Sequence, residues 1–369
     1  ILYICENLIL LMKKLVLSEL HEKIGGKMTN FAGYQMPIQY NEGVIAEHKT
    51  VRSTVGVFDV SHMGEIFIDG DNSFDFLQYI TTNDVSLLKP GKVQYTCLPN
   101  NTNGIVDDLL LYMIEKDKYL LVVNASNIEK DIAWIKEHNT FGCNIDNQSD
   151  NYSLLAVQGP KSIQLLEEIT DIKLSAIKYY NFKIGNIANI KNVILSRTGY
   201  TGEEGFELYV NNKDTHKLWN ALFKTSIELK PIGLAARDTL RLEKGFCLYG
   251  NDIDENTSPI EAGLAWITKF NKEFINHKKL KYQRDIGPKR KLVGIEIIDK
   301  GIARNGYSVI SDEGDVKGVI TSGTMSPTLG KAIALAYIST DMSEIGNEIL
   351  IQVRNKNIKG KIVPLPFVK

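Results

Sequence analysis

The sequence predicts an α+β fold: two β-α-β-β-α halves that form a central cleft, followed by a C-terminal all-β, barrel-like domain. Three observations support this. A strand–turn–helix pattern occurs twice, each copy is followed by a hairpin and a second helix, and short alternating strands follow residue 287. At 369 residues, the chain also exceeds the roughly 100–200 residues of one domain. We expect a first half at 13–150, a second half at 151–286 and the β domain at 287–369.

The repeated pattern is the first reason for two halves. Residues 66–81 (IFIDGDNSFDFLQYIT) align without gaps with residues 155–170 (LAVQGPKSIQLLEEIT). Gly70 and Gly159 mark the turn between an expected strand and an expected helix. Because strand–turn–helix units often resemble one another, the echo is compatible with an internal duplication or with a shared local pattern alone.

Each copy continues with a hairpin and a helix. The first has strands at 109–114 and 119–124 and a helix at 128–138; the second has strands at 193–197 and 206–210 and a helix at 215–229. In this alignment Asp108 matches Glu207. We therefore expect the two carboxylates at equivalent strand positions, facing one shared cleft.

The last eighty or so residues have a different pattern, which begins after Gly287-Pro288. Short runs of alternating apolar residues are separated by Gly and Asp-Gly turns, as in all-β domains. The expected strands are 292–298, 307–310, 316–322, 332–338 and 349–353.

Composition and charge exclude several classes of protein. Lys and Arg number 43 against 44 Asp and Glu, which leaves no general basic field for nucleic acid. No apolar run approaches the ~20 residues of a membrane span. Residues 1–12 are expected to be a leader that is not native to the protein, ending at a start on Met12. Because the N-terminal region is not Arg- and Ser-rich, we expect the cytoplasm rather than the mitochondrial matrix.

Motifs for common cofactors are missing from the sequence. There is no GxGxxG after a strand, and six residues separate Gly323 from Gly330-Lys331 where a P-loop has four. The four cysteines form no CxxC pair, and the six histidines have no paired spacing, so we expect them to be structural. A GxSxG elbow is also missing. We expect neither a nucleotide nor a metal.

Polar residues at strand ends are the candidates for function. Asp107 and Asp108 follow the hairpin signal Asn103-Gly104, and we expect Asp107 to bond the turn backbone and Asp108 to be functional. In 197–207, a tight hairpin explains three glycines but does not explain Tyr200 and Glu207.

Two arginines lie four residues apart on one face of an expected helix. Arg237 and Arg241 either serve a ligand or form solvated ion pairs with Asp238 or Glu243. The sequence pattern leaves both readings open.

Taken together, these segments resemble the aminomethyltransferase of the glycine cleavage system, the T-protein family. The resemblance runs from Lys14 to Val368 and depends on the order and spacing of short runs that are individually weak. These runs are FAGYQMP at 31–37, GVFDVSHMG at 56–64, GIVDD at 104–108, VN at 123–124, SRTGYTG at 196–202, GFE at 205–207, ARD at 236–238, LYG at 248–250, TSG at 321–323 and SPTLG at 326–330.

The resemblance implies a tetrahydrofolate-dependent transferase. In this family the methylene of an aminomethyl group on the lipoyl arm of the carrier H-protein passes to tetrahydrofolate. Ammonia leaves and 5,10-methylenetetrahydrofolate forms, a step of glycine catabolism and one-carbon metabolism. The expected partners are therefore the lipoylated H-protein and a small-molecule folate bound in the central cleft, with no metal, nucleotide, nucleic acid or membrane.

The family's functional residues match positions of this chain. Asp108 matches the key aspartate, expected to orient the folate, make N5 more nucleophilic and assist proton movement to ammonia. Glu207 matches the carboxylate that accepts hydrogen bonds from the pterin. The other expected folate-binding residues are Arg237, Tyr200, Met63, Tyr95, Tyr112, Asn124, Trp266 and Arg304.

Three alternatives remain open. The first is a folate-binding paralogue that assists iron–sulfur cluster assembly without transferase activity, because Lys244-Gly-Phe-Cys247 comes near the motif of those proteins. The second is the folate module of dimethylglycine or sarcosine dehydrogenases, for which the chain has no room for a flavin domain. The third is a purely structural role.

Overall fold

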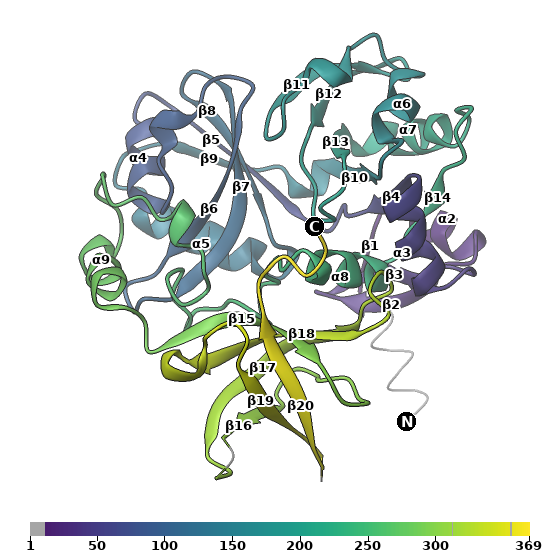
Figure 1. The fold of residues 1–369 in the computed structure, drawn as a ribbon. Coiled ribbons are helices and arrows are strands. Elements are labelled where there is room, and N and C mark those ends of the chain that lie inside the picture. Colours follow the sequence, from purple (N-terminus) through teal and green to yellow (C-terminus); the bar gives the residue numbers. More distant parts are fainter. Residues whose placement is uncertain (1–11, 312, 355) are drawn as a thin grey trace.

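The computed structural model describes residues 12–311, 313–354 and 356–369. Residues 1–11 of the expected leader therefore lie outside the described residues. Two α/β lobes lie above a β-barrel (Figure 1). An N-terminal sheet of three strands adjoins them, with helices α2 and α3. Its elements are β1 (Lys13–Lys14), α2 (Ser18–Lys23), β2 (Lys27–Phe31), β3 (Tyr34–Gln39) and α3 (Val44–Ser53).

The first lobe is a five-stranded antiparallel sheet with two helices on one face. Its strand order is β6-β7-β8-β5-β9. Apolar side chains of the sheet, such as Ile66 and Leu111, pack against Phe76 and Ile135 of the helices. The elements are β5 (Gly64–Asp69), α4 (Ser73–Ile80), β6 (Val93–Pro99), β7 (Ile105–Glu115), β8 (Lys118–Val123), α5 (Ile128–His138) and β9 (Asn144–Asn147).

The second lobe repeats this arrangement with a different edge. Its strand order is β11-β12-β13-β10-β4-β14. The elements are β4 (Gly56–Asp59), β10 (Tyr152–Gln158), α6 (Ser162–Glu167), β11 (Phe182–Ile187), β12 (Ile190–Ser196), β13 (Gly205–Asn211), α7 (Thr215–Leu222) and β14 (Lys230–Pro231). Strand β4 comes from the expected first half but pairs with β10. A division at residues 150 and 151 therefore does not separate the two sheets.

The strand orders correct one prediction. Because β6-β7-β8-β5 matches β11-β12-β13-β10, strand β7 corresponds to β12, and β8 corresponds to β13. Asp108 lies on β7 and Glu207 on β13, so the predicted equivalence of these two positions is wrong. The alignment matched the first strand of one hairpin with the second strand of the other.

The inner faces of the two sheets meet in a shared apolar core. Tyr112 and Leu120 of the first sheet pack there with Leu154 and Tyr209 of the second. Helix α8 (Leu234–Glu243) lies at the centre of the molecule, between the lobes and the barrel (Figure 1). It packs against α3 and β3 of the N-terminal part and against β17 and β18 of the barrel.

The C-terminal part is a closed barrel of six strands, which confirms the predicted fold class. Its elements, after helix α9 (His277–Ile286), are β15 (Arg290–Ile297), β16 (Ser308–Ile310), β17 (Val316–Met325), β18 (Ala332–Ser339), β19 (Glu348–Val353) and β20 (Lys356–Val363). Strand β20 was not predicted, because three lysines and Gly360 hide its alternation of Ile358 and Ile362. In the described ranges, no helix is both long and apolar enough to cross a membrane.

Candidate active site

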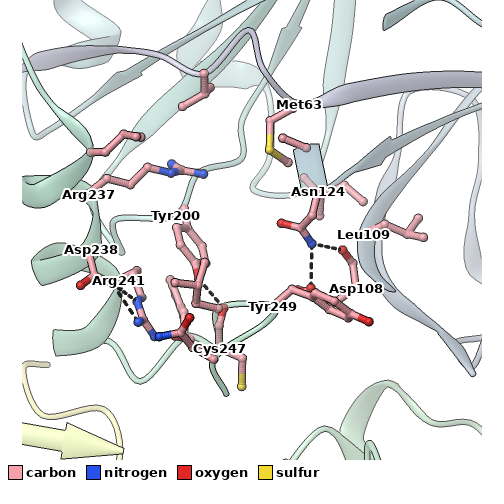
Figure 2. Close-up of a pocket in the computed structure, with 18 of the residues that line it drawn as sticks. Met63, Asp108, Leu109, Asn124, Tyr200, Arg237, Asp238, Arg241, Cys247 and Tyr249 are labelled. Atoms are coloured by element: carbon pink, nitrogen blue, oxygen red, sulfur yellow. Dashed lines mark hydrogen bonds and ion pairs between the residues drawn. The ribbon is translucent and has the colours of Figure 1, made fainter. Parts of the chain in front are cut away.

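A large cavity opens between the two sheets, helix α8 and the barrel. Its volume is about 1030 Å³, somewhat above the ~300–1,000 Å³ of ordinary small-molecule pockets. Figure 2 shows Asp108 and Asn124 on one side, Arg237 of α8 on another and Tyr200 between them. Every predicted site residue except Tyr112 lines it, namely Asp108, Glu207, Arg237, Tyr200, Met63, Tyr95, Asn124, Trp266 and Arg304.

Tyr112 is the one misplaced residue. Its side chain is fully buried between the sheets, where its hydroxyl group lies 2.8 Å from that of Tyr209 and 3.1 Å from Oγ of Ser196. Tyr209 lines the cavity instead. A signal for Tyr209 existed in the sequence, because residues two apart on a strand share a face and Tyr209 follows Glu207 by two.

Asp108 is held by two polar neighbours. The Tyr95 hydroxyl group donates to Asp108 Oδ2 at 2.9 Å, and Asn124 Nδ2 donates to Oδ1 at 2.9 Å. Burial raises the pKa of Asp108 to about 7, with a further contribution from the negative charge of Asp107. The carboxyl group can therefore gain or lose a proton near neutral pH, as a general acid or base requires.

Asp107 does not have its predicted turn role. It is fully buried within β7, and its carboxylate accepts hydrogen bonds from Asn124 N at 2.9 Å, Asn124 Nδ2 at 2.8 Å and Asn127 Nδ2 at 2.6 Å. The turn is stabilised from another position, because Asn100 Oδ1 accepts from Gly104 N at 2.7 Å. Asp107 was too deep in the strand to reach the turn backbone.

Glu207 and Arg237 form the opposite, charged side of the cavity. Glu207 is 6% exposed, and the Thr198 hydroxyl group donates to Oε2. Burial raises the pKa of Glu207, while Thr198 and the Arg237 charge oppose this rise. The Arg237 guanidinium lies 4.6 Å from the Tyr200 ring centroid, and its Nη1 has no hydrogen-bond partner among the described residues. A buried donor without a partner is consistent with a ligand contact.

Arg241 forms ion pairs, one of the two interpretations that the sequence leaves open for this residue. Its side chain is 1% exposed and forms ion pairs with Asp252 at 2.6 Å and with Asp238 at 2.8 Å. Nη2 also donates to Ser322 Oγ of the barrel at 2.8 Å. The pair with Asp252 is buried, whereas Asp238 is half-exposed, and the bond to Ser322 joins α8 to β17.

Trp266 and Arg304 lie at the rim. Trp266 is 61% exposed, and its ring centroid is 6.0 Å from that of Tyr95. Arg304 is exposed and donates to Gly323 O at 3.1 Å. Both side chains can therefore reach a ligand that extends out of the cavity.

His62 is a cavity residue that the sequence reading missed. The sequence pattern predicts a structural histidine here, yet His62 lines the cavity and its Nδ1 has no partner among the described residues. Burial and the nearby Arg237 charge lower the pKa of His62 to about 3, so the ring is neutral. Its place directly before Met63 was the available signal. The described residues contain no cluster of three or more His, Cys, Asp or Glu that could hold a metal ion.

A cavity with converging carboxylates, an arginine and aromatic rings is typical of proteins that bind a small molecule. Residues 17–272 match the GCVT N-terminal domain, and residues 290–369 match the glycine cleavage T-protein C-terminal barrel domain. The chain therefore belongs to the glycine cleavage T-protein family, a family of aminomethyltransferases, as the sequence motifs predicted.

Individual relatives match along almost the whole chain. Aminomethyltransferase of Bacteroides fragilis is 56% identical over 362 residues, covering 97% of this chain and 100% of the relative. That of Flavobacterium psychrophilum is 53% identical over 360 residues, with the same coverage of 97% and 100%. The crystal structure of glycine cleavage system aminomethyltransferase T from Bartonella henselae has a TM-score of 0.91 at 35% identity, covering 97% of this chain and 98% of that chain.

Proposed function

We propose that this chain transfers the methylene of the aminomethyl-lipoyl H-protein to tetrahydrofolate, releasing ammonia and forming 5,10-methylenetetrahydrofolate. The observation that carries this proposal is that Asp108 and Glu207 line the same cavity. Asp108 is a carboxyl group with a pKa near neutral pH, and Glu207 is a buried hydrogen-bond acceptor close to the charge of Arg237. The reaction needs both a proton acceptor and a pterin site, and these two side chains can supply them.

Asp108 is the proposed catalytic residue. In the transfer, N5 and N10 of the folate each give up a hydrogen, while the carrier sulfur gains one and the amine departs as ammonia. An ionised Asp108 can accept a folate proton and, once protonated, can supply it to the leaving groups. A positioned acid or base of this kind contributes about 10²–10⁴-fold in rate. Tyr95 donates its O–H and Asn124 its side-chain N–H to Asp108, and these hydrogen bonds hold the carboxyl group in place.

Glu207 is the proposed pterin contact. A carboxylate matches two parallel N–H donors, as the amino group and ring N–H of a pterin provide. Tyr200, Met63 and Tyr95 would cover the flat ring with aromatic faces and a thioether. The Arg237 donor without a partner fits a polar group of the folate, and Trp266 and Arg304 at the rim would meet its outer end.

The proposed partner is a lipoylated carrier protein. The cavity is lined by parts of both lobes and the barrel, and its rim includes exposed aromatic and basic side chains. A long flexible arm could enter there and meet the folate within. A site shared by arm and folate excludes water from a reactive carbon.

The iron–sulfur assembly alternative is less well supported. Cys247 is 8% exposed, and burial raises the pKa of its thiol well above the ordinary value. A thiol held protonated is a poor nucleophile and metal ligand. The full-length relatives named above carry the transferase name, in keeping with the proposed reaction.

An assay with an aminomethyl-loaded carrier tests the proposal. Ammonia should be released rapidly only when tetrahydrofolate is present, with equal amounts of methylenetetrahydrofolate. Carrier without the aminomethyl group serves as the control. Tetrahydrofolate binding without ammonia release would favour the non-catalytic paralogue, and no folate binding would favour a structural role.

A further inference from the structure

Besides Asp107 and Asp108, this region contains a third carboxyl group, that of Asp131, which has no part in the function proposed above. Asp131 is on the first turn of helix α5 and is fully buried. No N–H or O–H group of the described residues donates to either of its carboxyl oxygens. An unpaired, ionised carboxylate in such a place would be very unfavourable.

The Asp131 carboxyl group contacts that of Asp107. Two carboxyl groups in contact cannot both be ionised, so the pair holds a proton. Asp107 already accepts three hydrogen bonds from N–H groups of Asn124 and Asn127, which favour its charged form. The proton therefore belongs on Asp131, which donates to Asp107. Burial and the Asp107 charge raise the pKa of Asp131 to about 11, in agreement with this geometry.

Asn124 connects this pair with the active site. Its Nδ2 lies 2.8 Å from Asp107 Oδ1 and 2.9 Å from Asp108 Oδ1. Figure 2 shows the amide group of Asn124 turned toward Asp108. A negative charge on Asp107 attracts the amide N–H groups and so favours this orientation.

We propose that Asp131 is a positioning residue for the transfer reaction: it supplies the proton shared with Asp107, which leaves Asp107 negatively charged and Asn124 oriented toward Asp108. The proposal rests on the role of Asp108 proposed above. Asp131 acts only through Asp107 and Asn124, and it does not line the cavity. The Asp107 charge has a second effect, because it helps to raise the pKa of Asp108.

Other titratable groups surround the pair. Lys130 Nζ donates to Val106 O and to the Tyr249 hydroxyl group, each at 2.7 Å, and lies 3.3 Å from Glu255. Its charge is thus engaged elsewhere, although it opposes the rise in the pKa of Asp131. The remaining groups near the three carboxyl groups are Tyr95, Cys97, Cys247, Tyr180, Tyr200 and Tyr249. Burial raises the pKa of all six above the ordinary values, so they stay uncharged near neutral pH.

The pH dependence of transfer, measured as kcat and KM, tests the proposal in Asp131→Leu and Asp131→Asn. We expect transfer by the unchanged protein to fall as Asp108 is protonated, near pH 7. With leucine at position 131, Asp107 loses its hydrogen-bond donor and binds a proton more readily. Once neutral, it no longer repels the charge on Asp108. The pH at which kcat decreases should then be lower by about one unit. This shift corresponds to a free-energy difference of the size contributed by one charged hydrogen bond.

Asp131→Asn is the matched variant, because its amide N–H can still donate to Asp107. The pH at which its kcat decreases should remain within a few tenths of a unit of the value for the unchanged protein. A purely structural role would lower kcat equally at every pH. The proposal would be overturned if kcat of Asp131→Leu decreased at the same pH as in the unchanged protein, or if this pH shifted equally in both variants.

Infrared difference spectroscopy provides a test that needs no transfer activity and no leucine variant. At about pH 9, between the pKa of Asp108 at about 7 and that of Asp131 at about 11, the unchanged protein should show a protonated carboxyl signal missing from Asp131→Asn. Glu65→Gln is the control, because Glu65 is another buried carboxyl without described donors, and it should remove a separate signal. An unchanged spectrum in Asp131→Asn would reject the shared proton even if transfer itself is established.

Discussion

At the scale of single residues, the role proposed for Asp108 predicts that its ionisation sets the pH range of transfer. Its pKa is raised to about 7, so the group is increasingly protonated as the pH falls below 7. Since a protonated carboxyl group cannot accept a folate proton, kcat should decrease tenfold per pH unit well below that value. A stopped-flow or coupled assay between about pH 5 and 9 would measure this.

Asp108→Asn removes the titrating group while keeping its shape. Transfer should drop by about 10²–10⁴-fold, and the remaining rate should lose its dependence on pH near 7. Tetrahydrofolate affinity should stay within a few-fold. Unchanged turnover would remove Asp108 from the mechanism.

Glu207 should affect binding rather than chemistry. In Glu207→Ala the pterin donors lose their acceptor, so tetrahydrofolate should bind more weakly by about 1–3 kcal/mol. Titration calorimetry measures this, with the exposed, cavity-remote Glu228→Gln as the control. Equal affinity of Glu207→Ala and the unchanged protein would contradict the assignment.

The site was partly predictable because its residues follow recognisable strand and turn signals. Asp108 and Glu207 stand out as carboxylates inside apolar runs, and both line the cavity. Tyr112 was misassigned, because the sequence does not show where along a strand two sheets close against each other. Asp107 was misassigned for a related reason: its partners Asn124 and Asn127 lie on the next strand end and helix start, which only the fold brings near.

At the scale of elements, the start of β7 determines where Asp108 lies. A Cβ at Gly104 would lie 1.7 Å from the backbone oxygen of Glu255, which is not a flexible group. Gly104→Ala should therefore displace the beginning of β7, lower the free energy of unfolding by about 1–3 kcal/mol and reduce transfer. Urea unfolding and the transfer assay would measure both effects.

Asn103→Gly is the matched control in the same turn. Asn103 has a φ of 78°, a value that glycine adopts more readily, but its Oδ1 accepts a hydrogen bond from Asn276 Nδ2 at 2.7 Å that glycine removes. The variant should therefore lose about 1 kcal/mol or less of unfolding free energy. An equal loss in both variants would indicate general sensitivity of the turn rather than the close approach at Gly104.

The predicted elements were most accurate where apolar periodicity was uninterrupted. The hairpin of β7 and β8 and the helix α5 lie where the pattern placed them. Strand β20 was missed because Gly360 interrupts its apolar face, which leaves only Ile358 and Ile362 to mark the alternation. The placement of β4 was also beyond the local pattern, since pairing with β10 joins residues about a hundred positions apart.

At the scale of the whole molecule, Glu243 of α8 links α3 of the N-terminal part to the barrel. This buried carboxylate accepts hydrogen bonds from the barrel residues Ser326 and Thr328 and from Arg52 of α3. Burial alone would raise its pKa, but hydrogen bonds from His48, Ser326 and Arg52 outweigh this and lower the pKa to about 2. The ionised form is thus favoured in the folded protein.

This lowered pKa predicts the direction of acid unfolding. The contribution of Glu243 to stability should be complete above its ordinary pKa of 4.5 and disappear as the pH falls toward 2. A shift of this size corresponds to about 3 kcal/mol. In Glu243→Gln, urea unfolding measured across this range should lose that part of the pH dependence, whereas the exposed Glu344→Gln should keep it. Identical pH dependence in Glu243→Gln and the unchanged protein would contradict this role.

The insertion of β4 into the second sheet limits how the molecule can be divided. A protein cut between β9 and β10 would leave the C-terminal fragment without β4, exposing one side of β10 to solvent and to other chains. The two lobes thus cannot be produced as separate, self-sufficient pieces at that point. Reassembly of such fragments would have to begin with one piece donating a strand to the other, as in split-protein complementation.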